Sequence, residues 1–290
     1  MKPVDVALAL SVAFAWGLAF VFTKLALETL SPALLLAIRF GVAALPVLVL
    51  PRPALPVSLV LAIGATWFVG QFFFQFLGIR FGVPAGIAAV VVQSQALLTV
   101  ALAALFAGER PDGRQILAMA AASLGLVVIA GAASGSFSLG ALAVLMLSPA
   151  SFAAGNLLMR RVDRGDMAAL VAWLSLVPPL PGIALALVLD GPEAILAGLA
   201  ATSATGWLSA LYLGLVATTF GYAAWGRLLA AYPAARLAPF PLLVPVIGAC
   251  AASLLLGERF GPAQLSGMAL VLAGLAILLA PRMDRGARSG

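Results

Sequence analysis

Apolar runs of about 20 residues follow one another along the chain, separated by short breaks that are polar or rich in proline and glycine. Because a helix needs roughly 20 apolar residues to cross a bilayer, each run is long enough to span it. The pattern predicts an all-α membrane protein with ten transmembrane helices. They are expected at residues 4–23, 32–50, 57–77, 83–106, 115–133, 139–158, 167–189, 206–230, 236–256 and 263–280. The break at 190–205 holds an apolar run too short to cross, and we expect it at the membrane interface.

The composition supports the membrane class and excludes several others. Hydrophobic residues make up 64% of the 290 residues and charged residues 9%, against about 25% charged residues in a typical soluble protein. So few charges cannot cover the surface of a soluble protein. The chain has no histidine and one cysteine, Cys250, which excludes histidine-based catalysis, histidine-bound zinc and an intrachain disulfide. We therefore expect no cofactor, no metal and no enzymatic activity.

The basic residues indicate the orientation in the membrane. The net charge is +6, and ten spans place both termini on one side. Loops on that side carry twelve Lys and Arg residues and the opposite loops carry three, while Arg39 lies inside the second predicted span. Because basic loops stay in the cytoplasm, we expect cytoplasmic termini and a multi-pass protein of the cell (inner) membrane. The expected partners are the lipid bilayer and a small-molecule substrate, not nucleic acid; the oligomeric state is open, and a monomer is compatible with the sequence.

Parts of the sequence recur. Gly108-Glu109-Arg110 returns as Gly257-Glu258-Arg259, a shift of 149 residues that also aligns Pro84-Ala85 with Pro233-Ala234. A weaker repeat links residues 14–17 with residues 152–155 at a shorter offset.

These repeats divide the chain into two halves of five predicted helices, residues 1–134 and residues 135–290, the second ending in a short basic cytoplasmic tail. Since five is odd, the second half enters the membrane from the opposite side. Inverted repeats are typical of transporters whose halves exchange inward and outward conformations around a midplane site. An old duplication that serves only stability is the alternative.

In this order, the motifs resemble the drug/metabolite transporter superfamily, specifically its EamA-type carriers with ten helices. The resemblance covers essentially the whole chain and implies a basket of helices around a central cavity. The branch that it resembles most exports amino acids and related metabolites. The second half departs from the first because Ala154 stands where the first half has Trp16. The resemblance is carried by Trp16-Gly17, Phe20, Lys24, Pro32, Arg39-Phe40, Pro84-Ala85 and the two Gly-Glu-Arg triplets.

Arg39 is the permanently charged residue within a predicted span. It lies about eight residues from the outer end of that span, roughly 12 Å of helical rise, near the limit of its reach to the headgroups. Charged groups at such depth are costly and mark functional sites. Two roles stay open: binding a substrate carboxylate, or a structural role against backbone carbonyls and helix ends.

Neutral polar side chains lie at similar depth. Gln71 and Gln75 are one helical turn apart and share a face. Gln93 and Gln95 are two residues apart, so we expect Gln93 in the cavity and the other in helix packing. Asn156 is expected on the cavity wall as well. Carboxamides suit a zwitterion because each offers donors and an acceptor without charge, although hydrogen bonding between helices is the alternative.

Aromatic residues are expected to complete this cavity. Trp16 and Phe20 lie on the first predicted helix, and Thr218, Tyr222 and Trp225 form a stripe at helical spacing on the eighth. Such a stripe also suits simple packing. Interfacial anchoring is expected of Trp67, Trp207 and Tyr232. Helix interruptions are expected at Pro149, at residues 178–181 and at residues 239–245.

Every Asp and Glu lies at a span end or in a loop, so no carboxylate is expected in the cavity. This argues against proton antiport and against strongly cationic substrates. For the two Gly-Glu-Arg triplets we favour a simple interpretation, in which glycine ends the helix and the Glu-Arg pair is solvated. A role as gates is the alternative.

We therefore expect a transporter that exports amino acids or similar small neutral or zwitterionic metabolites by alternating access. The alternative is a carrier of lipid-linked or nucleotide-sugar metabolites, whose phosphates would require more basic residues in the cavity. The substrate site is expected to comprise Trp16, Phe20, Arg39, Gln71, Gln75, Gln93, Asn156, Thr218, Tyr222 and Trp225.

Overall fold

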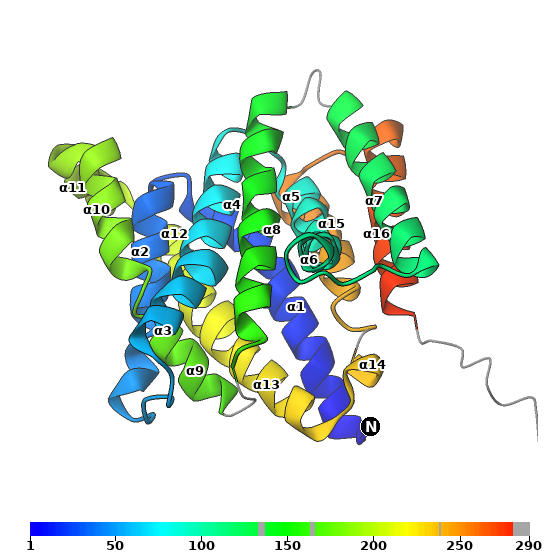
Figure 1. Ribbon diagram of the computed structural model, residues 1–290. Coiled ribbons are helices and arrows are strands. Elements are labelled where there is room, and N and C mark those ends of the chain that lie inside the picture. The colour runs from blue at the N-terminus through cyan, green and yellow to red at the C-terminus, as the bar shows by residue number, and fades with distance from the viewer. Residues whose placement is uncertain (133–136, 163–165, 238, 281–290) are drawn as a thin grey trace, which may run out of the picture.

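The computed structural model describes residues 1–132, 137–162, 166–237 and 239–280, and all regular secondary structure in these residues is helical. This confirms the expected all-α fold for the described part of the chain; the predicted basic tail, residues 281–290, lies outside it. Figure 1 shows the arrangement of α1 (Pro3–Ala26), α2 (Pro32–Ala43), η1 (Leu45–Leu48), α3 (Val57–Ile63), η2 (Gly64–Gly70), α4 (Gln71–Arg80), α5 (Ala85–Val91), η3 (Val92–Ser94), α6 (Gln95–Phe106), α7 (Gly113–Gly131), α8 (Leu139–Met159), α9 (Met167–Leu174), α10 (Pro179–Leu189), α11 (Gly191–Ala201), α12 (Ala204–Leu211), η4 (Tyr212–Phe220), α13 (Gly221–Ala231), α14 (Ala234–Leu237), α15 (Leu243–Leu256) and α16 (Pro262–Leu279).

Among the described residues, eight helical stretches are long and apolar enough to cross a membrane. Two other predicted spans correspond to the shorter apolar helices Pro32–Leu48 and Leu243–Leu256, and the predicted interfacial segment corresponds to α11. The eight long stretches are Pro3–Ala26, Val57–Arg80, Ala85–Phe106, Gly113–Gly131, Leu139–Met159, Met167–Leu189, Ala204–Ala231 and Pro262–Leu279.

Prolines break some of these helices and not others. The Pro178-Pro179 pair lies between α9 and α10, with Pro179 at the first position of α10, where its missing N–H costs nothing. Pro239 and Pro241 lie between α14 and α15. The prediction for Pro149 is wrong, because α8 continues through it without interruption. Membrane helices tolerate an internal proline where neighbouring groups satisfy the freed carbonyl.

Three segments inside long spans have π- or 3₁₀-helical winding. Residues Gly64–Gly70 and Tyr212–Phe220 form π-helical turns, and Val92–Ser94 forms a 3₁₀ turn. Uniform apolar runs gave no sign of these changes. Such segments often occur at functional sites, because they rotate the following side chains around the helix axis.

Small residues set the closest helix contacts. On α7 and α16, an added Cβ on Gly125 would lie 2.6 Å from the carbonyl oxygen of Gly267, and one on Gly267 would lie 2.8 Å from that of Gly125. On α1, an added Cβ on Gly17 would lie 2.6 Å from a side-chain atom of Ile247 of α15. Close backbone approach of this kind is how membrane helices gain packing energy without a hydrophobic effect between them.

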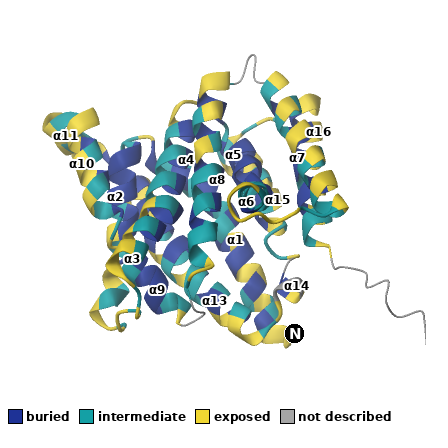
Figure 2. Ribbon diagram, in the orientation of Figure 1, coloured by how far each residue is buried: buried dark blue, intermediate teal, exposed yellow. Residues whose placement is uncertain are grey.

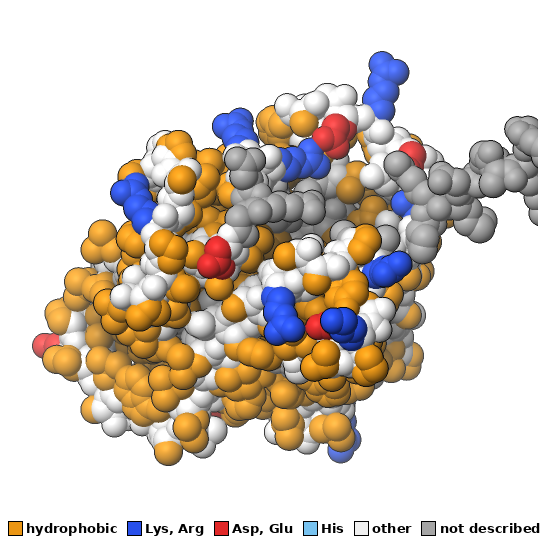
Figure 3. Space-filling view, turned by 90° about the horizontal axis from the view of Figure 1, so that it is seen from below, with side chains coloured by type: hydrophobic (Ala, Val, Ile, Leu, Met, Phe, Trp, Pro, Cys, Tyr) orange, Lys and Arg blue, Asp and Glu red, His pale blue; other side chains and the backbone are white. Residues whose placement is uncertain are grey.

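Large apolar side chains cover much of the outer surface. Leu48, Val188 and Leu254 are 81%, 81% and 84% exposed. Figure 2 shows the exposed residues on the outward sides of peripheral helices such as α7, α11 and α16, and the buried residues toward the centre of the bundle. Exposed apolar side chains on the outward sides of the helices are suited to lipid. Figure 3 shows the molecule from below Figure 1, the side on which the N-terminus lies, and several Lys and Arg side chains are visible there among hydrophobic ones.

The two ends of the bundle are identified by polar contacts. At the N-terminal end, the Tyr232 hydroxyl donates to Asp5 Oδ2 at 2.6 Å. At the opposite end, which we call the Glu258 end, Lys24 Nζ lies 2.9 Å from Glu258 Oε1. The Glu258 side chain is 7% exposed, so the expectation of a solvated Glu-Arg pair is wrong for the second triplet. The expectation of a solvated glutamate agrees with Glu109, whose side chain is 55% exposed and pairs with Arg160.

Candidate functional site

A cavity of about 390 Å³ lies inside the bundle. The structure brings nine of the ten expected site residues to its wall and leaves out Thr218, which is buried behind it. Arg39 is the charged residue on the wall, and most of the others are aromatic, aliphatic or carboxamide side chains. The nine are Trp16, Phe20, Arg39, Gln71, Gln75, Gln93, Asn156, Tyr222 and Trp225.

The cavity extends toward the N-terminal end of the bundle. Met159 at the end of α8, Met167 at the start of α9, Leu229 of α13 and Pro241 also line it. Met167 belongs to the N-terminal end, since its Cβ packs where Gly226 of α13 leaves room. Lys24 and Glu258, at the other end, do not line the cavity.

Arg39 lies at the cavity wall with a partly satisfied guanidinium group. It is 2% exposed, and its Nε donates to Thr218 Oγ1 at 3.0 Å. Its Cζ lies 4.0 Å from the centroid of the Phe72 ring, a cation–π contact. Its Nη1 is buried and has no hydrogen-bond partner among the described residues. No carboxylate of the described residues forms an ion pair with Arg39.

The π-helical segment η4 positions two of the groups around Arg39. Thr218 Oγ1 donates to the carbonyl oxygen of Leu213, five residues earlier, at 2.8 Å while accepting from Arg39. The indole Nε1 of Trp16 donates to the carbonyl oxygen of Ala217 at 2.9 Å. The π winding thus presents backbone and side-chain oxygens to residues of the first half of the chain.

The glutamines supply amide groups to the same cavity. Gln71 and Gln75 are 5% and 3% exposed and lie one turn apart on α4. The expectation that Gln93 and Gln95 point to different places is wrong, since both line the cavity. The 3₁₀ turn between them reduces their separation around the axis from about 160° to about 120°. The Oε1 atoms of Gln71 and Gln95 are buried and have no partner among the described residues.

Both polar atoms of the Asn156 side-chain amide form hydrogen bonds. Its Oδ1 accepts from Trp67 Nε1 at 2.8 Å, and its Nδ2 donates to Thr99 Oγ1 at 3.0 Å. Trp67 is 8% exposed and stacks on Phe152 with 5.0 Å between ring centroids. The expectation of Trp67 as an interfacial anchor is therefore wrong. Its position near the middle of the stretch from Val57 to Arg80 was the signal that could have shown this.

Aromatic rings form a continuous wall across the two halves of the chain. The ring centroid of Trp16 lies 5.6 Å from the ring centroids of both Tyr222 and Trp225. The ring centroids of Tyr222 and Trp67 are 5.7 Å apart. Sequence reasoning missed the wall residues Phe72, Gln95, Phe152, Met159 and Met167. Hydropathy does not separate an aromatic residue on a cavity wall from one in helix packing.

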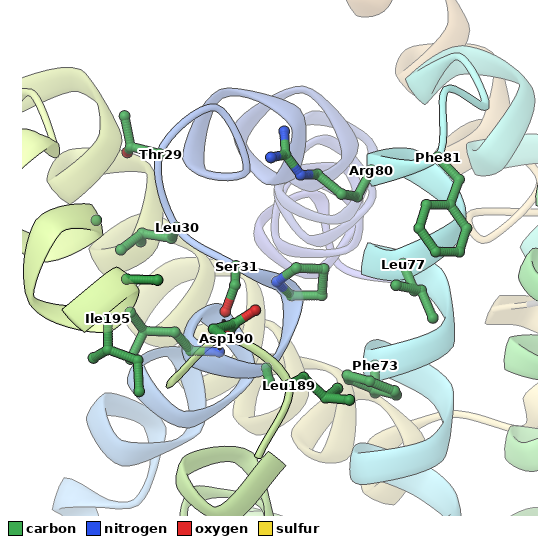
Figure 4. A pocket seen from close by; sticks show the side chains of 15 residues that line it. Thr29, Leu30, Ser31, Phe73, Leu77, Arg80, Phe81, Leu189, Asp190 and Ile195 are labelled. Atoms are coloured by element: carbon green, nitrogen blue, oxygen red, sulfur yellow. Dashed lines mark hydrogen bonds between the residues drawn. The ribbon is translucent and has the colours of Figure 1, made fainter. Parts of the chain in front are cut away.

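A separate pocket of about 400 Å³ lies at the Glu258 end, between α2, α4 and α11 (Figure 4). Figure 4 shows Phe73, Leu77 and Arg80 along α4 on one side, and Ser31 and Asp190 on the other. This pocket shares no residue with the central cavity. Because Arg39 and the glutamines line the central cavity, it is the candidate substrate site.

Comparison with known proteins identifies the family. A model of the EamA-like transporter family matches residues 5–131 and again residues 139–280. This chain belongs to the EamA-like transporter family. Transport rather than catalysis is therefore indicated, and the apolar helices make it a multi-pass membrane protein.

Its relatives include named exporters. A probable amino-acid metabolite efflux pump of Salmonella typhimurium is 40% identical over 285 residues, covering 96% of this chain and 95% of the relative. A protein of the same description from Escherichia coli is 38% identical over 284 residues, with the same coverage of both chains. A probable terminal-alkyne amino-acid exporter of Streptantibioticus cattleyicolor is 31% identical over 201 residues, 68% of this chain and 64% of the relative.

A solved structure confirms the fold. This crystal structure is 18% identical in sequence and superposes with a TM-score of 0.63 over 98% of this chain and 100% of its own. The resemblance to EamA-type amino-acid exporters that the sequence shows is thus confirmed by the family match and by the relatives.

Proposed function

We propose that this protein exports amino acids or similar small zwitterionic metabolites across the bacterial inner membrane. The observation that carries the proposal is Arg39, a buried cation on the wall of the central cavity that forms no ion pair with a carboxylate of the described residues. The names of the relatives support a substrate of this class.

Arg39 would bind the substrate carboxylate. A buried charge is costly in a membrane protein unless an opposite charge and hydrogen bonds compensate it. Thr218 accepts a hydrogen bond from Nε, whereas Nη1 is buried and has no hydrogen-bond partner among the described residues. A carboxylate that reaches Nη1 would supply both the missing hydrogen bond and the missing negative charge.

The amide oxygens would bind the substrate ammonium. The Oε1 atoms of Gln71 and Gln95 are buried acceptors without a partner among the described residues. Leaving such atoms unpaired costs free energy, and an ammonium group offers three donors. Trp16, Tyr222 and Trp225 would contact the apolar part of the substrate.

The export cycle would use alternating access between two inverted halves. With the shorter helices Pro32–Leu48 and Leu243–Leu256 counted as spans, the chain would cross the membrane ten times and both termini would lie on one side. The basic loops support the cytoplasm as that side. The N-terminal end of the bundle is then the cytoplasmic end, and the cavity extends toward it. The structure would thus represent an inward-facing state that can load substrate from the cell.

Counterflow into proteoliposomes tests the proposal. The purified protein is reconstituted with unlabelled amino acid inside, and uptake of labelled amino acids from a mixed panel is followed. We expect saturable exchange, inhibition by other amino acids, and no inhibition by the corresponding amino-acid amides, which lack the carboxylate that Arg39 requires.

Arg39→Gln is the decisive variant, and Arg80→Gln, at an exposed position on α4, is the matched control. Exchange should fall to background in the first and stay at the parental level in the second, with both proteins monodisperse. Exchange at the parental level in Arg39→Gln would overturn the role of Arg39. Exchange of nucleotide sugars but of no amino acid would overturn the substrate class in favour of the alternative carrier.

A further inference from the structure

The second Gly-Glu-Arg triplet places a buried carboxylate at the Glu258 end. Glu258 Oε1 accepts from Lys24 Nζ at 2.9 Å and from the backbone N–H of Ala85 at 2.8 Å. Its Oε2 accepts from the backbone N–H of Gly86 at 3.0 Å. The carboxylate therefore binds the end of α1 and the start of α5 simultaneously. A negative charge at the start of a helix is stabilised by the exposed N–H groups and by the helix dipole.

These contacts join the two halves of the chain. Lys24, Ala85 and Gly86 belong to the first half, and Glu258 belongs to the second. The same end is tightly packed, since an added Cβ on Gly86 would lie 3.1 Å from the Cα atom of Ala249. An added Cβ on Gly248 would lie 2.6 Å from the Cβ of Ala89. Solute cannot pass between α5 and α15 at this end while these contacts hold.

The first triplet has a different environment at the N-terminal end. Glu109 corresponds to Glu258 at the shift of 149 residues. It is 55% exposed, against 7% for Glu258, and pairs with Arg160, which is itself 46% exposed. The central cavity extends toward this end. The two equivalent glutamates are thus in unequal states: one is buried at the closed end and the other is solvated at the end that the cavity approaches.

We infer that Glu258 and Glu109 are alternating gate residues of the transport cycle. In the state seen here, Glu258 with Lys24 and α5 keeps the outer end closed. In the opposite state, Glu109 with Arg160 would bind the chain segment that corresponds to the start of α5. The inference rests on the two-state cycle of the proposed function.

The repeat in the sequence identifies that segment. The shift of 149 residues takes Ala85 and Gly86 to Ala234 and Ala235, at the start of α14. The weaker repeat, 14–17 with 152–155, takes Lys24 to a position two residues after Arg160. Each half therefore supplies the glutamate for one end, and the other half supplies the cation and the backbone N–H groups. The Glu109–Arg160 pair is already formed here, so the contacts that would change are those of each glutamate with backbone N–H groups. Forming these contacts at one end and breaking them at the other changes which end is open.

Side-specific cysteine labelling tests this inference without any substrate. In a Cys250→Ser background, Ala19→Cys places a thiol on the cavity wall. A membrane-impermeant maleimide is added to spheroplasts, to reach the outer side, or to inverted membrane vesicles, to reach the cytoplasmic side. The background protein should be labelled mainly from the cytoplasmic side.

Glu258→Gln should raise the ratio of outer to cytoplasmic labelling by about five- to tenfold, the effect of losing charge-assisted hydrogen bonds in one state only. Glu109→Gln should leave this ratio unchanged or lower it. Glu193→Gln, at an exposed glutamate of α11, is the matched control and should have no effect. If Glu258→Gln does not fold, Lys24→Met removes the ion pair while the carboxylate still binds α5, and it should raise the same ratio less strongly.

The ratio separates a gate from a structural contact. General destabilisation would raise labelling from both sides equally and leave the ratio unchanged, and this result for Glu258→Gln would overturn the inference. A rise in Glu109→Gln as large as in Glu258→Gln would overturn it as well. Since labelling uses no substrate, a shifted ratio together with absent amino-acid exchange would contradict only the proposed substrate class.

Discussion

The Nε atom of Arg39 donates a hydrogen bond to the hydroxyl of Thr218 at 3.0 Å, and both side chains are buried. This contact joins α2 of the first half to the π-helical segment η4 of the second. It leaves Nη1 of Arg39 without a partner among the described residues. Thr218 therefore fixes how the guanidinium group faces the cavity, although it does not line the cavity itself.

Thr218→Val should weaken amino-acid binding by at least about tenfold, because a hydrogen bond to a charged group contributes roughly 1.5–3 kcal/mol. Thr218→Ser keeps the hydroxyl and should bind with an affinity near that of the parent protein. Equilibrium binding to the purified protein by calorimetry measures both. Equal affinities of the valine and serine variants would show that Thr218 does not position Arg39.

Gly221→Ala should reduce transport through a steric effect on Trp16. An added Cβ on Gly221 would lie 2.5 Å from the indole Nε1 of Trp16, the atom that donates to the Ala217 carbonyl. The indole must then move into the cavity or lose this hydrogen bond. Gly41→Ala on α2 is the matched control, since an added Cβ there meets no atom within 4 Å. The initial rate of amino-acid counterflow should fall several-fold in the first variant only, and equal rates would contradict the effect.

Hydropathy predicts this fold well because membrane helices have a strong signal. Apolar runs of sufficient length require helical backbone in lipid, so the all-α class follows from composition and pattern. Hydropathy does not show whether a segment is wound as an α-helix, a π-helix or a 3₁₀-helix. The π turns at Gly64–Gly70 and Tyr212–Phe220 lie inside apolar runs, where neither charge nor proline marks them. The unbroken α8 at Pro149 shows the converse, since a proline alone does not decide whether a membrane helix continues.

Residues of the candidate site could be predicted where a polar or charged side chain is costly in the membrane interior. Arg39, Gln71 and Gln75 are expensive in a membrane interior, and the structure brings them to one cavity; their substrate-binding role stays a prediction. Aromatic residues, which are not costly to place in the membrane interior, were harder to assign to the cavity. Trp67 and Phe152 are as favourable in helix packing as on a cavity wall, so only the tertiary structure shows that they line the cavity.

Asn156 and Trp67 should contribute to stability as a pair. Asn156 Oδ1 accepts from Trp67 Nε1 at 2.8 Å, so Asn156→Leu leaves the buried indole N–H without a partner, at about 1–3 kcal/mol. Trp67→Phe removes the donor. The double variant should be less destabilised than the sum of the single variants, by about 0.5 kcal/mol or more. Thermal unfolding in detergent measures this coupling; strict additivity would show that the hydrogen bond contributes nothing.

Transport should not be driven by a proton gradient. Arg39 is the charged side chain on the cavity wall, and no carboxylate of the described residues lines it, so the cavity lacks a group that would exchange a proton at neutral pH. Amino-acid counterflow should therefore proceed at the same rate with or without an imposed pH difference across the proteoliposome membrane. A collapsed gradient, obtained with a protonophore, is the control. Accumulation of substrate against its own gradient when only the pH difference is imposed would show a proton-coupled step, and would require a proton acceptor outside the cavity wall.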